Sequence, residues 1–176
     1  MLLFEKEVIQ MIDAKDAVLL AHLRKNARAT LTDISRETDV PVSTIFERLK
    51  GPLGKYVKRY TCLLDNTQTG FTARATLIMK VDKEQKHEIG QFLQRHQNVN
   101  SLYRINNGYD FLADVIFRNM MELEEFIEFL ETKFKVKHRD VYLIIDEVKQ
   151  EGFMADPQTV QLVVEPRQAK TRQKQH

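Results

Sequence analysis

The spacing of apolar residues changes after the first third of this 176-residue chain. Before that point apolar positions recur every three or four residues, which is typical of amphipathic helices. They predict three helices, over residues 13–26, 30–38 and 41–50. Gly51-Pro52 ends the third helix, because proline lacks a backbone N–H and clashes with the preceding turn. The second and third helices, joined by a short turn, have the layout of a helix-turn-helix whose second member enters DNA.

The segment that follows is rich in aromatic and β-branched residues, and it predicts a strand over residues 56–64. A strand after a helix-turn-helix is a wing, which can lay basic side chains along phosphates. The simpler alternative is a linker to the next domain, and both can hold. We therefore expect residues 1–64 to form a winged helix-turn-helix domain.

From Phe71 the pattern alternates between strand and helix periods. It predicts strands over 71–80, 99–105, 111–117 and 141–148, and helices over 82–96 and 119–134. The order β-α-β-β-α-β is the ferredoxin-like split βαβ unit. The predicted fold class is therefore α+β, a winged helix-turn-helix followed by a ferredoxin-like βαββαβ sandwich over residues 65–152.

A sheet with both helices on one face leaves its other face uncovered. Apolar side chains expected there need a partner, and they are Ile78, Leu112, Ile116, Tyr142 and Ile144. Pairing of two sheets is the economical answer, so we expect a homodimer or a higher even-numbered oligomer.

Residues 153–176 are expected to form a C-terminal extension and basic tail. Within it, Val160–Val164 predicts one more strand. The tail from Pro166 is polar and basic, which predicts disorder and gives a weak case for DNA contact.

Charge is unevenly distributed although the net charge is only +2. Residues 1–60 carry 11 basic and 8 acidic side chains, residues 61–165 carry 12 and 17, and residues 166–176 carry 4 and none. Basic ends and an acidic middle indicate domains with different partners.

Basic residues cluster from Ser43 to Arg59, where Glu47 is the only acid. Such a cluster can neutralise DNA phosphates, although a solvated helix end is the common alternative. For Arg48 that alternative is an ion pair with Asp33 or Glu37. The basic cluster coincides with the predicted helix-turn-helix, and this coincidence favours double-stranded DNA as the partner. The candidate DNA contacts are Arg28, Ser43, Thr44, Arg48, Lys50, Lys55, Lys58 and Arg59.

Other chemistry finds little support in the composition. A single cysteine, Cys62, excludes an internal disulfide, and the five histidines lack metal-ligand spacing. We therefore expect no metal, cofactor or catalytic residue. The N-terminus lacks the pattern of a signal peptide, and no 18-residue apolar stretch occurs, so a cytoplasmic protein without membrane association is expected.

Several runs in their order and spacing resemble the Lrp/AsnC (leucine-responsive, or feast/famine) transcription regulators over residues 12–148. They are Asp13-x-x-Asp16-x-x-Leu19-Leu20-x-x-Leu23, Asn26-Ala27-Arg28, Leu31-x-Asp33-Ile34, Ser43-Thr44-Ile45-x-x-Arg48-Leu49-Lys50, Val57-Lys58-x-Tyr60-Thr61, Gly70-Phe71 and Gly108-x-Asp110. The resemblance implies promoter binding, dimers or larger even-numbered oligomers, and a small effector such as an amino acid.

The resemblance also implies roles for single residues. Arg48 matches an arginine of the recognition helix, and Gly108 and Asp110 match a loop near the effector site. The candidate effector contacts are Asn107, Gly108, Tyr109 and Asp110, although Asn-Gly is also simply how a tight hairpin obtains positive φ angles. The chain departs from the family pattern at Pro41, at Glu47 and in the stretch 51–56, which puts the target sequence in doubt.

Two alternatives remain open at this level. Some proteins that resemble this family in layout decarboxylate sirohaem, which requires His or Arg side chains around a tetrapyrrole cavity. The five histidines here are scattered over separate elements. The second alternative is an assembly partner that has lost DNA binding.

Overall fold

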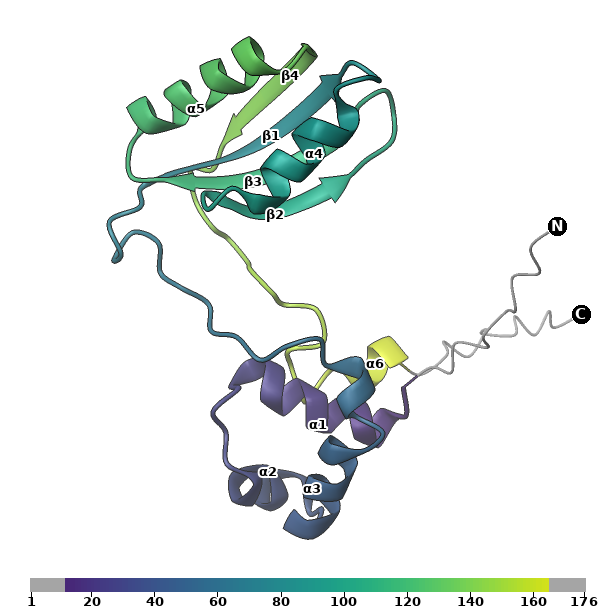
Figure 1. The fold of residues 1–176 in the computed structure, drawn as a ribbon. Coiled ribbons are helices and arrows are strands. Elements are labelled where there is room, and N and C mark those ends of the chain that lie inside the picture. Colours follow the sequence, from purple (N-terminus) through teal and green to yellow (C-terminus); the bar gives the residue numbers. More distant parts are fainter. Residues whose placement is uncertain (1–11, 165–176) are drawn as a thin grey trace, which may run out of the picture. The chain divides into compact units, whose positions relative to one another are not determined.

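The computed structural model describes residues 12–164, which form two compact units (Figure 1). One contains residues 12–62 together with residues 149–164, and we call it the helical unit. The other contains residues 63–148, and we call it the sheet unit. Each unit has its own buried apolar core, so each is described by itself.

The helical unit contains the predicted helix-turn-helix. Its elements are α1 (Ala14–Lys25), α2 (Leu31–Thr38), α3 (Val42–Lys50), the short 3-10 helix η1 (Gly54–Tyr56) and α6 (Gln161–Val164). The Thr30 hydroxyl oxygen accepts from the N–H of Asp33 at 3.1 Å and caps α2. Asp39, with φ +56°, ends α2 in the left-handed region. The core of α1, α2 and α3 is made by Leu19, Leu20, Ile34, Ile45 and Leu53.

The predicted wing is wrong. Residues 57–64 form no strand, and no strand occurs in the part of the helical unit that the structure describes. Tyr60, Leu63 and Leu64 are exposed. A strand is stabilised by the neighbour with which it pairs, and this segment has none in its own unit.

The strand predicted at Val160–Val164 is also wrong, because Gln161–Val164 forms the short helix α6. Val160 and Val164, four residues apart, are both buried, which is helical spacing. They pack against Ala17 and Ala21 on α1; Figure 1 shows α6 beside α1. Residues 153–164 of the C-terminal extension are therefore part of the helical unit, and the basic tail predicted from Pro166 lies outside the described residues.

The sheet unit has the predicted order of strands and helices. Its elements are β1 (Ala73–Val81), α4 (Lys86–Arg95), β2 (Val99–Arg104), β3 (Phe111–Phe117), α5 (Met120–Lys133) and β4 (Val136–Leu143). The strands pair antiparallel in the order β2-β3-β1-β4, and α4 and α5 cover one face (Figure 1).

The last strand lies earlier than the predicted 141–148. β4 begins at Val136, directly after α5, because Phe134 is buried at the end of that helix. The charged residues of β4 interrupt the alternation of apolar residues from which strands were predicted. Charged residues are common on edge strands, and β4 is an edge strand.

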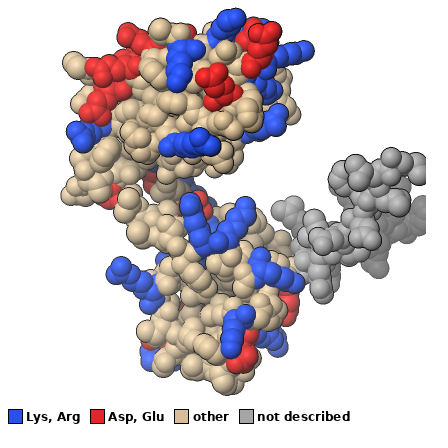
Figure 2. All heavy atoms as spheres, in the orientation of Figure 1, with Lys and Arg blue, Asp and Glu red and all other residues tan. Residues whose placement is uncertain are grey.

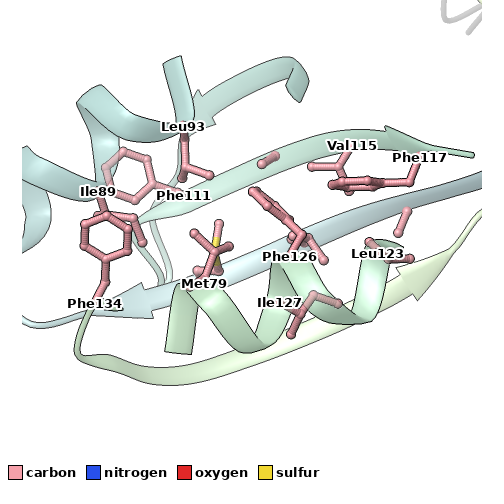
Figure 3. Packing of buried hydrophobic residues seen from close by; sticks show 14 of the residues in the cluster. Met79, Ile89, Leu93, Phe111, Val115, Phe117, Leu123, Phe126, Ile127 and Phe134 are labelled. Atoms are coloured by element: carbon pink, nitrogen blue, oxygen red, sulfur yellow. The ribbon is translucent and has the colours of Figure 1, made fainter. Parts of the chain in front are cut away.

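The sheet-unit core lies between the sheet and its two helices (Figure 3). β1 and β3 alternate buried and half-buried positions, and their register pairs Ala75 with Val115 and Leu77 with Ala113. From the helices, Ile89, Leu93, Leu123, Phe126 and Ile127 pack onto this face. The opposite face of the sheet carries no helix of the sheet unit.

Candidate DNA-binding and ligand-binding sites

Helix α3 turns its first polar residues outward. Ile45 is fully buried against α1 and α2. Ser43 and Thr44, which precede it on the first turn, are exposed. Pro41 stands at the N-cap and has no side chain that could cap the helix. The free N-terminal N–H groups and two hydroxyls of this turn are therefore available to an external partner.

The basic candidates around α3 are exposed and without ion-pair partners. Within residues 12–164 none of them pairs with an acid; they are Arg28, Lys50, Lys55, Lys58 and Arg59. The Lys55 ammonium lies 4.9 Å from the centroid of the Tyr56 ring, a cation–π contact. In Figure 2 the visible face of the helical unit shows more Lys and Arg than Asp and Glu. Unpaired ammonium and guanidinium groups are those that can neutralise phosphates.

Arg48 differs from the other basic candidates. Its guanidinium forms an ion pair with Asp16 on α1, whose side chain is only 13% exposed. The sequence suggested Asp33 or Glu37 as partners, but Asp33 lies near Arg36 and Glu37 near His22, each at 3.5 Å. The pair thus joins α1 to α3. Asp16 carries no local signal for this role, since 32 residues separate the partners.

The tip of the β2–β3 hairpin has the expected tight-turn geometry. Asn107 and Gly108 have φ angles of +60° and +88°, as a primed turn requires. Both residues are exposed. A Cβ added at Gly108 would meet no atom within 4 Å, so the tip is open to its surroundings.

Asp110, at the base of the same hairpin, is held from two directions. One carboxylate oxygen pairs with the Lys86 ammonium of α4, and the other accepts from the N–H of Val81 at 3.0 Å. Its own N–H donates to the Met79 carbonyl at 2.9 Å. Burial raises the pKa of Asp110, but the bonds from Lys86 and Val81 outweigh burial and hold the pKa below its usual range.

Tyr109 ties the hairpin to the far edge strand. Its hydroxyl donates to the Asp140 carboxylate at 2.6 Å, which raises the pKa of Tyr109 because the bond favours the protonated phenol. His138 lies 3.4 Å from the same carboxylate. The four candidate effector residues therefore fall into two sets, an open tip at 107–108 and a fixed base at 109–110.

Comparison with known proteins places these features in a family. A family profile described as "Lrp/AsnC ligand binding domain" matches residues 74–153. An HTH-type transcriptional regulator of Pyrococcus horikoshii is 24% identical over 147 residues, which cover 83% of this chain and 99% of the relative. Residues 74–153 thus match the Lrp/AsnC ligand-binding domain, and the chain as a whole is similar to HTH-type transcriptional regulators.

Solved structures of transcriptional regulators share the fold of this chain. Bacillus subtilis LrpC superposes with a TM-score of 0.71 at 18% identity, over 80% of this chain and 99% of that one. A transcriptional regulator of Neisseria meningitidis, solved in complex with L-Met, superposes with a TM-score of 0.73 at 20% identity, over 79% and 93%. They agree on a helical N-terminal region followed by a βαββαβ domain.

The comparisons bear on the functional classes raised by the sequence. The relatives are transcriptional regulators and not enzymes, which speaks against the sirohaem decarboxylase. The profile match contains all four candidate effector residues, so they lie in the Lrp/AsnC ligand-binding domain. Within residues 12–164, no helix is long and apolar enough to span a membrane, and no group of three or more His, Cys, Asp or Glu could hold a metal ion.

Proposed function

We propose that this chain is a transcription regulator of the Lrp/AsnC type that binds promoter DNA in a sequence-specific manner as a homodimer or higher even-numbered oligomer, and that an amino acid or similar small effector alters its assembly. The observation that carries the DNA part is the surface of α3 and the segment after it. Ser43 and Thr44 are exposed at the start of α3, and unpaired basic side chains follow from Lys50 to Arg59.

The candidate contacts divide by chemistry. Hydroxyls at the N-terminus of a recognition helix can reach base edges, which specify sequence. Lys50, Lys55, Lys58 and Arg59, with Arg28, supply positive charge that binds phosphate without regard to sequence. Arg48 keeps free guanidinium N–H groups beside its pair with Asp16, because guanidinium has five donors.

The open face of the sheet supports assembly. Tyr103 and Tyr142 on this face are 55% and 54% exposed, and Ile144, two residues after Tyr142, is 39% exposed. Apolar area of this kind on a sheet face is typical of a protein–protein interface. A two-fold dimer through this face predicts a near-palindromic operator with half-sites in phase with the DNA turn, about 10 bp or a multiple apart.

The base of the hairpin suits a zwitterion. An amino acid presents an ammonium and a carboxylate, and Asp110 and Lys86 form a pair with the complementary charges. The effector ammonium would bind Asp110, while its carboxylate would bind Lys86 or the N–H groups around Gly108. The L-Met bound by the Neisseria meningitidis regulator supports this ligand class.

The DNA proposal is tested by genome-wide footprinting of the purified protein, with and without pooled amino acids. On the DNA site with the strongest footprint, Lys50→Ala should weaken binding. It should also make the slope of log K against log salt shallower, by the amount expected for the loss of about one phosphate contact. Lys15→Ala is the matched control, because Lys15 is an exposed lysine of the same unit on α1. A parent protein without footprints would favour an assembly partner that has lost DNA binding.

The effector proposal is tested by analytical ultracentrifugation across an amino-acid panel. Asp110→Asn should keep DNA binding but abolish the effect of an amino acid on oligomer size, because the amide cannot compensate an ammonium. A variant that responds as the parent does would move the effector site elsewhere. A parent that responds to no amino acid would leave the domain with assembly alone.

A further inference from the structure

The recognition helix α3 exposes an aromatic side chain. Phe46 is 51% exposed, although Ile45, the residue before it, is fully buried. Phe46 is not part of the apolar core that α1, α2 and α3 share. Within residues 12–164 its ring takes part in no aromatic pair and no cation–π contact. A single exposed apolar residue is common on protein surfaces, so its meaning depends on where it lies.

The position of Phe46 places it on the outward stripe of α3. Ser43, Phe46, Glu47 and Lys50 are all exposed, and they follow the i, i+3, i+4, i+7 spacing of one helix face. The stripe begins with a hydroxyl proposed to contact bases and ends with a lysine proposed to contact phosphate. Phe46 and Glu47 therefore lie in the middle of the surface that α3 would present to the major groove.

Glu47 is the acid of this stripe, and its charge is not compensated within the helix. Within residues 12–164 its carboxylate forms no ion pair, and the neighbouring Arg48 pairs with Asp16 instead. A carboxylate beside a phosphate would weaken DNA binding by repulsion. At a base edge, however, a carboxylate can accept a hydrogen bond from the amino group of cytosine. The place of Glu47 in the stripe therefore favours a base edge as its partner.

We propose that Phe46 and Glu47 are specificity-determining residues that read two pyrimidines in the major groove. Phe46 packs on the C5-methyl group of a thymine, and Glu47 accepts from the N4 amino group of a cytosine. Both groups lie on the major-groove edge of their base, where adjacent side chains of one helix can reach neighbouring bases. This inference rests on the proposed DNA binding and extends it from the class of ligand to the bases that are read.

The thymine methyl group provides a test that a structural role of Phe46 would not satisfy. The full chain first selects binders from a library of duplexes of randomised sequence. In the selected duplex each thymine is then replaced in turn by deoxyuridine, which removes only the methyl group. At the contacted position the parent should bind about fourfold more weakly, the equivalent of one buried methyl group. Phe46→Ala should bind the thymine and deoxyuridine duplexes equally.

Phe153→Ala is the matched control, because Phe153 is an exposed phenylalanine of the helical unit outside α3. This control should show the same loss on deoxyuridine as the parent. A parent that loses affinity at no thymine, or a Phe46→Ala variant that keeps the loss, would overturn the thymine contact. A parent that binds no duplex would instead overturn the DNA-binding function itself.

The test of Glu47 depends on the direction of the change in affinity. Glu47→Ala should bind the selected duplex about fivefold more weakly or worse, and it should no longer discriminate when the contacted C·G pair is exchanged. On a mixed-sequence duplex it should bind at least as tightly as the parent, because one repulsive charge is gone. Equal strengthening on both duplexes would mean that Glu47 faces phosphate, which would overturn the cytosine contact.

Discussion

Val160→Ala tests whether the C-terminal extension is part of the helical core. Val160 is 1% exposed against α1, whereas Val163 on α6, three residues later, is 50% exposed. The substitution at Val160 removes two buried methyl groups, worth about 0.8 kcal/mol each, and leaves a small cavity. We expect a loss of about 1.5–2.5 kcal/mol from the free energy of unfolding of the helical unit. Val163→Ala should change it by less than about 0.5 kcal/mol, because alanine also has the better helix propensity.

Hydrogen exchange read by mass spectrometry resolves the effect by element. The slowest amides of α1 should exchange about 10- to 60-fold faster in Val160→Ala, since every 1.4 kcal/mol is a factor of ten. Peptides from β1 and β3 serve as internal controls, because they belong to the sheet-unit core. Equal exchange of α1 in the two variants and the parent would refute the docking of α6. Equal acceleration by both variants would refute the assignment of Val160 as the buried side chain.

Three further predictions concern the candidate sites. Arg48→Ala and Asp16→Ala should both destabilise the helical unit, but only Arg48→Ala should also weaken operator binding, by about 1–3 kcal/mol in a gel-shift titration; equal binding losses would leave Arg48 with a structural role alone. Because the folded pKa of Asp110 is lowered, its stabilisation is present above the unfolded value of about 3.9 and is lost as pH falls through the folded value. The difference in unfolding free energy between the parent and Asp110→Asn should therefore shrink in acid denaturation, and a constant difference would contradict the pair with Lys86. Gly108→Ala should cost about 1–2 kcal/mol of thermal stability through its positive φ alone, since no atom crowds the new Cβ; an unchanged Tm would contradict the turn geometry.

The sequence predicted elements whose signal is local. The cap at Thr30, the break at Gly51-Pro52 and the alternation along β1 each depend on residues close in the chain. The wing prediction was wrong because the aromatic and β-branched residues of this segment fit a strand pattern, whereas the described part of the helical unit has no second strand to pair with it. The run at 160–164 failed because a short apolar segment fits either period, and the deciding contact with Ala17 is distant in sequence.

The site residues were predicted by type but not by partner. The basic residues after α3 are exposed, as expected for charged side chains whose sequence neighbours include no acid to offset their charge. The partners of Arg48, Asp110 and Tyr109 lie 32, 24 and 31 residues away along the chain. No periodicity or motif encodes such pairs, since they depend on how separate elements pack.

The segment after the sheet unit packs on α1, and this determines how the two units are connected along the chain. The sheet unit, residues 63–148, is an insertion within the helical unit, which is built from two separate stretches of sequence. The chain therefore passes between the two units twice, once after Cys62 and once before Lys149. A truncated chain that ends before the extension lacks Val160 and Val164, the two buried side chains that pack on α1. If the sheet unit is removed and Cys62 is joined to Lys149, every described residue of the helical unit stays in one chain.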